Sequence, residues 1–68
     1  MLAKDATQGR RYRVLACPPY EYLTIGQVYE CTTQTRGTTG LHRPSGGPGT
    51  YLCNEHARTS VVLESVDA

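Results

Sequence analysis

Apolar and polar residues alternate along this chain in short runs that glycine and proline interrupt, and this pattern constrains its fold most. In residues 11–17 the side chains of Tyr12, Val14 and Ala16 share one face, as in a half-buried strand. The prolines at 18–19 end the run, because proline cannot donate a hydrogen bond to a sheet. No segment keeps a helical period beyond one turn, so the pattern predicts a protein built mainly from strands.

Three further strands are predicted from β-branched and aromatic residues. They cover residues 28–33, 50–54 and 60–66, and residues 55–58 fit a single helical turn between the last two. Glu30 marks the outward face of the first of these strands. Short strands, glycine turns and no long helix predict an all-β fold, a small antiparallel β-barrel of about five short strands.

Glycine and proline concentrate in the middle of the chain. Residues 34–50 hold five of the seven glycines and two of the four prolines. This composition predicts a long Gly/Pro-rich hairpin loop, which could contain a short irregular strand near Leu41. Residues 1–9 have no period and are expected to form a flexible lead-in to a single domain over residues 1–68.

Charge and hydropathy exclude several classes of protein. Seven Lys and Arg residues stand against six Asp and Glu residues, a net charge of +1, which excludes an acidic nucleic-acid mimic and a generally basic protein. No apolar run approaches the roughly 18 residues of a membrane span, and the N-terminal residues lack a signal-peptide pattern. We therefore expect a cytoplasmic protein without a membrane partner.

The three cysteines are too few for a disulfide scaffold, and they raise the question of a metal site. Residues 53–56 have a C-x-x-H spacing, so Cys53 and His56 could join Cys17 and Cys31 in a zinc-stabilised mini-domain. Paired cysteine knuckles are missing, which favours folding without zinc or another cofactor. A nucleophilic Cys53 with His56 as its base lacks an orienting carboxylate, so we expect no enzymatic activity.

Arginine and tyrosine are the candidate binding residues. The predicted interface joins the loop 18–22 with the hairpin 34–50, and it consists of these side chains: Tyr20, Tyr22, Arg36, His42 and Arg43. With a net charge near zero, the sequence favours a protein partner. The alternative is a direct nucleic-acid-binding barrel, in which such arginines and tyrosines would stack on bases.

One segment resembles a known family. Residues 23–30, LTIGQVYE, resemble the L-T-x-G-K-x-Y-x-V element of small phage and prophage proteins with an SH3-like barrel, although Gln27 replaces the usual lysine. As in that family, a strand that ends at a cysteine, Cys17, precedes the element, and a valine-rich strand follows at the C-terminus. The family pattern gives Leu23 the role of a loop anchor, Gly26 that of a turn and Tyr29 that of a barrel plug.

The resemblance implies an SH3-like β-barrel of phage or prophage origin. It leads us to expect a non-catalytic accessory protein, in the cytoplasm of a bacterial host, that binds and inhibits or modulates a host protein complex. Host defence or nucleic-acid machinery is the expected target. Because such barrels serve unrelated tasks, the resemblance does not by itself imply one activity.

Overall fold

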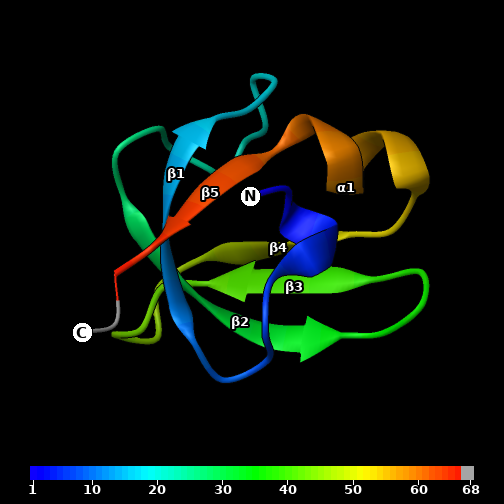
Figure 1. Ribbon diagram of the computed structural model, residues 1–68. Helices are drawn as coiled ribbons and strands as arrows, with labels where there is room; N and C mark the ends of the chain where they lie inside the picture. Colours follow the sequence, from blue (N-terminus) through cyan, green and yellow to red (C-terminus); the bar gives the residue numbers. More distant parts are fainter. Residues whose placement is uncertain (67–68) are drawn as a thin grey trace.

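The computed structural model describes residues 1–66, so the last two residues of the expected 1–68 domain lie outside the described residues. The chain is mostly β structure, with five antiparallel strands in one sheet and one short α-helix (Figure 1). The elements, in chain order, are the 3₁₀-helix η1 (Ala3–Asp5), β1 (Arg11–Ala16), β2 (Val28–Gln34), β3 (Thr39–His42), β4 (Gly49–Leu52), α1 (Glu55–Ser60) and β5 (Val62–Ser65).

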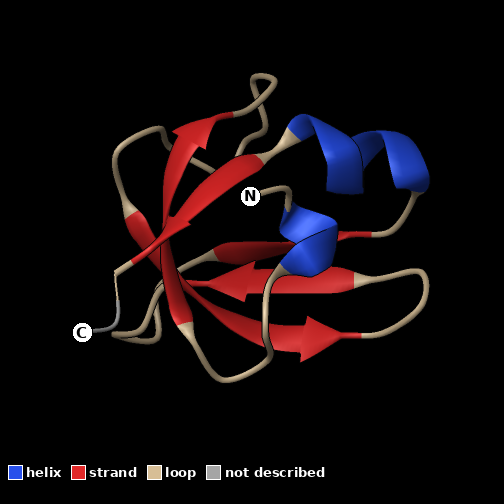
Figure 2. Ribbon diagram, in the orientation of Figure 1, coloured by secondary structure: helices blue, strands red, loops and turns tan. Residues whose placement is uncertain are grey.

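The strands are hydrogen-bonded in the order β4-β3-β2-β1-β5. Strands β1 to β4 each pair with the next strand along the chain, and β5 returns beside β1 with Val14 opposite Leu63. The sheet is strongly twisted, so that β1 and β5 cross the direction of β3 and β4 (Figure 2). Both helices lie on one side of this twisted sheet, beside β3 and β4 in the view of Figure 2.

The core consists of the alternate side chains that the sequence pattern places on one face. Tyr12 and Val14 of β1 are buried, and so are Tyr29 and Cys31 of β2, as the alternation predicts. Each buried tyrosine keeps a hydrogen bond at its hydroxyl: Tyr12 Oη accepts from the backbone N–H of Thr7 (2.8 Å) and Tyr29 Oη from that of Thr24 (2.9 Å). The two rings therefore fill the core without an unsatisfied polar group.

The short strand anticipated near Leu41 is present, so the long loop expected over residues 34–50 is divided in two. The segment contains β3, whose residues Thr39, Gly40 and Leu41 are all buried, in pairing with both β2 and β4. Only a turn at 35–38 and a loop at 43–48 are irregular. Glycine is tolerated in this strand because a neighbouring side chain covers it: a Cβ on Gly40 would lie 2.9 Å from the ring of Tyr51.

The N-terminal segment also differs from the expected flexible lead-in. Ala3 and Ala6 are buried, and their carbonyl oxygens accept hydrogen bonds from Nε2 of Gln34 at 3.0 and 2.7 Å. Leu2 forms a β-bridge with Val62. Side chains as small as alanine give no clear hydrophobic period, and for that reason the sequence pattern did not indicate this packing.

The connection between β1 and β2, residues 17–27, adopts the turn expected from the LTIGQVYE element. Leu23 is 5% exposed, and Gly26 has a φ of +91°, a conformation that favours glycine. The N–H of Gly26 donates to the carbonyl of Val14 (2.8 Å), so the connection closes back onto β1.

The helical turn expected at residues 55–58 is a short α-helix. The side chain of Asn54 accepts a hydrogen bond from the N–H of Ala57 (2.8 Å) and caps its first turn. Neither helix found in residues 1–66 has the length and apolar character needed to cross a membrane.

Candidate interaction surface

The two tyrosines of the predicted interface lie on the β1–β2 connection but differ in exposure. Tyr20 is half-buried and packs against the core. Tyr22 is 47% exposed. Only the second ring is thus available as a contact for another molecule, while the first supports the connection from below.

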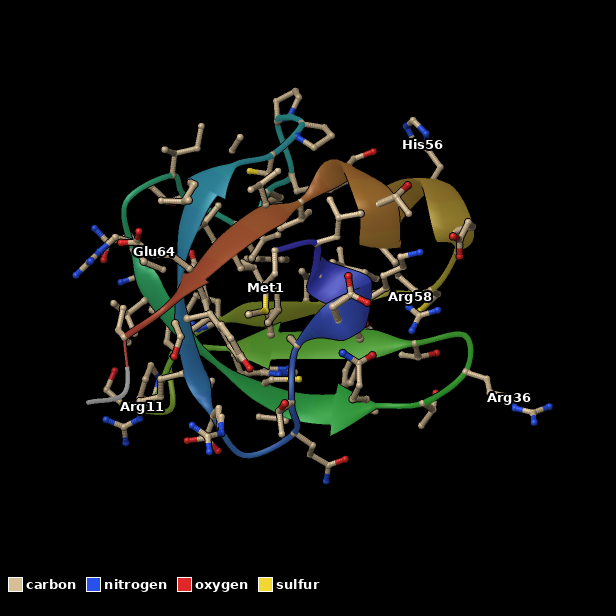
Figure 3. All side chains as sticks on the ribbon, in the orientation of Figure 1. Met1, Arg11, Arg36, His56, Arg58 and Glu64 are labelled. Carbon is tan, nitrogen blue, oxygen red and sulfur yellow. The ribbon has the colours of Figure 1, made fainter. Side chains whose placement is uncertain are left out.

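The structure does not bring the other predicted residues together. Arg36 lies on the turn 35–38, and in Figure 3 its side chain points away from the molecule. His42 and Arg43 lie at the opposite end of β3. The expected single hairpin is therefore two separate connections, and these basic residues form no common surface with Arg36.

His42 and Arg43 are held by contacts within the chain. The His42 ring is joined to Thr32 by a hydrogen bond between Nδ1 and Oγ1 (2.8 Å), and it meets the Tyr51 ring edge to face at 5.0 Å. The Arg43 guanidinium lies over the ring of Tyr29, 5.8 Å from its centroid. Both side chains are half-buried, and within residues 1–66 the buried Nε of Arg43 has no hydrogen-bond partner.

Three large apolar side chains are exposed at the end of β1 and on the connection between β1 and β2. We call them the loop rim: Leu15, Tyr22 and Ile25, with 45%, 47% and 60% of the residue exposed. Two backbone hydrogen bonds, from Val14 N to Gln27 O (3.1 Å) and from Gly26 N to Val14 O (2.8 Å), hold the backbone of the connection against β1. Leu15 follows Val14 and Ile25 precedes Gly26, so Leu15 and Ile25 are neighbours.

The arginines of β1 face carboxylates. Arg11 lies 3.8 Å from Glu30, and Arg13 Nη1 donates to Glu64 Oε1 at 3.2 Å. Figure 3 shows Arg11 and Glu64 on the same side of the molecule. Such exposed pairs contribute little to stability, but they reduce the positive potential that a phosphate backbone would meet.

Arg58 is a site that the sequence did not reveal. This residue of α1 is 7% exposed, and its guanidinium donates to four acceptors in other parts of the chain. The acceptors are Thr39 Oγ1 (3.1 Å), Arg36 O (2.7 Å), Gln34 Oε1 (3.2 Å) and Thr35 O (2.9 Å). All are neutral oxygens, so Arg58 joins α1 to the turn between β2 and β3. A lone arginine in a short polar helix carries no sequence signal for this role.

The cysteines and histidine of the zinc alternative are dispersed. Cys31 is buried in the core, Cys17 is half-buried and Cys53 is exposed, and all three are free thiols. Within residues 1–66 no three His, Cys, Asp or Glu side chains come close enough together to hold a metal ion. Burial is the main cause that raises the pKa of the Cys31 thiol, and it also raises the pKa of the Cys17 thiol. Both therefore favour the protonated form, which is a poor metal ligand.

The surface of the described residues has no pocket that could enclose a small molecule. Comparisons with family models, with curated proteins and with solved structures give no match. The arrangement of the chain's own residues is accordingly the basis for a functional conclusion.

Proposed function

We propose that this protein is a non-catalytic protein-binding module with an SH3-like barrel fold, and that the loop rim is its contact surface. The strand order supports this fold, because β1 lies between β2 and β5 and a short helix links β4 to β5. The long connection between β1 and β2 is the other feature in its favour. Binding residues on small barrels usually lie on such connections, which a rigid sheet holds in place.

The exposure of the loop rim is the observation that carries this proposal. A single exposed apolar side chain needs no explanation, but Leu15 and Ile25 are neighbours, and Tyr22 belongs to the same connection. Leu15 lies on a strand and Tyr22 on a hydrogen-bonded connection, so little conformational freedom is lost on binding. Burial of the rim by a partner would remove apolar surface from water.

A protein partner fits this surface better than nucleic acid. A nucleic-acid footprint needs a continuous positive face, and Arg11 and Arg13 face Glu30 and Glu64 instead. The resemblance of residues 23–30 to small phage proteins supports a bacterial host protein complex as the partner. The buried Leu23 and Tyr29 and the positive φ of Gly26 agree with the pattern of that element.

Capture of a partner by the intact chain and by point variants tests the proposal. A tagged chain is mixed with bacterial lysate, with and without nuclease treatment, and bound proteins are identified by mass spectrometry. Ile25→Asp and Tyr22→Asp place a charge on the loop rim and are expected to reduce capture of a specific protein at least tenfold, since interface centres exclude unpaired charge. Gln8→Asp is the control, because Gln8 is exposed in the turn before β1 and the change adds the same charge there.

Retention of the captured protein by Gln8→Asp, and in the presence of nuclease, supports the proposal. Thermal unfolding of each variant, followed by circular dichroism, separates loss of binding from loss of fold. Capture that survives both rim substitutions would contradict the proposed surface. Capture that disappears on nuclease treatment would instead favour the nucleic-acid alternative.

A further inference from the structure

The two edges of the sheet differ in how they are covered. Along β5 the first N-terminal residues form a single β-bridge between Leu2 and Val62: the Met1 amino group donates to Leu63 O (2.7 Å), and Leu63 N donates to Met1 O (2.7 Å). Ala3 N also donates to Val61 O (2.9 Å). At the other edge, no backbone group of residues 1–66 outside β3 bonds to the backbone of β4, and only the Cys53 thiol donates to the carbonyl of Tyr51 (3.6 Å). Apart from that contact, the outer backbone groups of β4 have no strand beside them and can pair with another strand.

The β4 edge lacks three of the devices that usually prevent such pairing, namely charged side chains, bulges and internal prolines, although the strand is short, with four residues. Residues 44–54, which include β4, contain no charged residue, and Pro48 lies just before the strand. The register between β3 and β4 runs from Thr39 opposite Leu52 to His42 opposite Gly49 without a shift, so β4 carries no bulge.

We infer that the free edge of β4 pairs antiparallel with β4 of a second copy of this chain, around a two-fold axis. Two-fold pairing sets each segment against itself, and a charged segment would meet like charge; the neutral segment 44–54 does not. Tyr51, 55% exposed, lies in β4 and shares a face with His42. In the pair, the two Tyr51 rings lie on one face of a continuous sheet and cover each other.

Sedimentation of the whole chain over a range of concentrations tests this inference. A four-residue strand pair buries little area, so we expect a weak dimer that is half formed only at about 100 μM or above. Tyr51→Lys places two like charges opposite each other across the two-fold axis. This variant is expected to remain monomeric even at ten times the concentration at which the original chain is half dimeric. Tyr22→Lys makes the same chemical change on the loop rim and is expected to leave the dimer intact.

Amide hydrogen exchange gives a second measurement, which stays informative even if Tyr51→Lys fails to fold. In the original chain, protection of the β4 amides is expected to rise with protein concentration, while that of the β1–β2 connection stays constant. A chain that remains monomeric near 1 mM overturns the inference. A dimer that Tyr22→Lys dissociates, or whose β4 amides gain no protection, overturns it as well.

Discussion

At the scale of single residues, Arg58 does more for this fold than its place in a short helix suggests. A buried charge is costly unless hydrogen bonds compensate it. Here one guanidinium satisfies the carbonyls of Thr35 and Arg36 together with the side-chain oxygens of Gln34 and Thr39. Gln34 in turn binds the carbonyls of the N-terminal segment, so α1, the β2–β3 turn and η1 share one hydrogen-bond network.

Replacement of Arg58 by alanine is expected to lower the free energy of unfolding by about 3 kcal/mol, because one buried and three part-buried hydrogen bonds are lost. Arg58→Lys is expected to recover less than half of this loss, since an ammonium cannot reproduce the planar fork. Urea unfolding followed by circular dichroism measures both values. Arg36→Ala is the control: it removes an exposed side chain but keeps the carbonyl that Arg58 binds, so a change below about 0.5 kcal/mol is expected. Equal losses for Arg58→Ala and Arg36→Ala would contradict the network.

At the scale of elements, β3 is a strand in which aromatic rings compensate for glycine. Gly40 lies opposite Tyr51, and His42 lies opposite Gly49. A Cβ on Gly40 would meet the Tyr51 ring, and one on Gly49 would meet the His42 ring and the carbonyl of Leu41. Glycine normally weakens a strand. Here the Tyr51 ring lies over Gly40, the His42 ring lies over Gly49, and the two rings pack against each other.

A double-mutant cycle between Gly40 and Tyr51 tests this arrangement. Gly40→Ala alone is expected to destabilise the protein by about 1 kcal/mol, because the new methyl group displaces the Tyr51 ring from its contact with His42. In a Tyr51→Ala background the same change is expected to cost less, since the ring is absent and only Thr32 Oγ1, 3.0 Å from the added Cβ, must still move.

Urea unfolding of the four chains gives the coupling energy of the cycle. Gly37→Ala serves as the control, because Gly37 is an exposed turn residue and its Cβ would meet no atom within 4 Å. If the effects of Gly40→Ala and Tyr51→Ala simply add, with no coupling energy, the packing of the Tyr51 ring does not depend on the absence of a side chain at Gly40.

At the scale of the whole molecule, the sequence predicted strands where alternation is strong and failed where side chains are small. The face formed by Tyr12 and Val14, the turn at Gly26 and the helical turn after Asn54 all follow from local pattern. Strand β3 was anticipated only as a short irregular strand near Leu41, because its glycine is compensated by a ring distant in sequence. The candidate surface was predicted only in part: Tyr22 is exposed as expected, but the position of Arg36 relative to Arg43 depends on β3.

The N-terminal segment, which has no hydrophobic period, also contributes to stability. It adds to the core and covers the β5 edge of the sheet. A chain that begins at Thr7 loses the buried Ala3 and Ala6, the backbone bonds along β5 and the acceptors of Gln34. We expect this truncation to lower the free energy of unfolding by about 2–4 kcal/mol, a large part of the roughly 3–10 kcal/mol typical of a chain of this size.

Urea unfolding measures that loss, and sedimentation is expected to show aggregation of the truncated chain, because the uncovered β5 edge becomes available for pairing. The double substitution of Lys4 and Asp5 by alanine is the control, since both side chains are exposed and the backbone bonds of the segment remain. Its stability is expected to stay within about 0.5 kcal/mol of the original. A truncated chain as stable as the full one would mean that the segment covers the edge without supporting the fold.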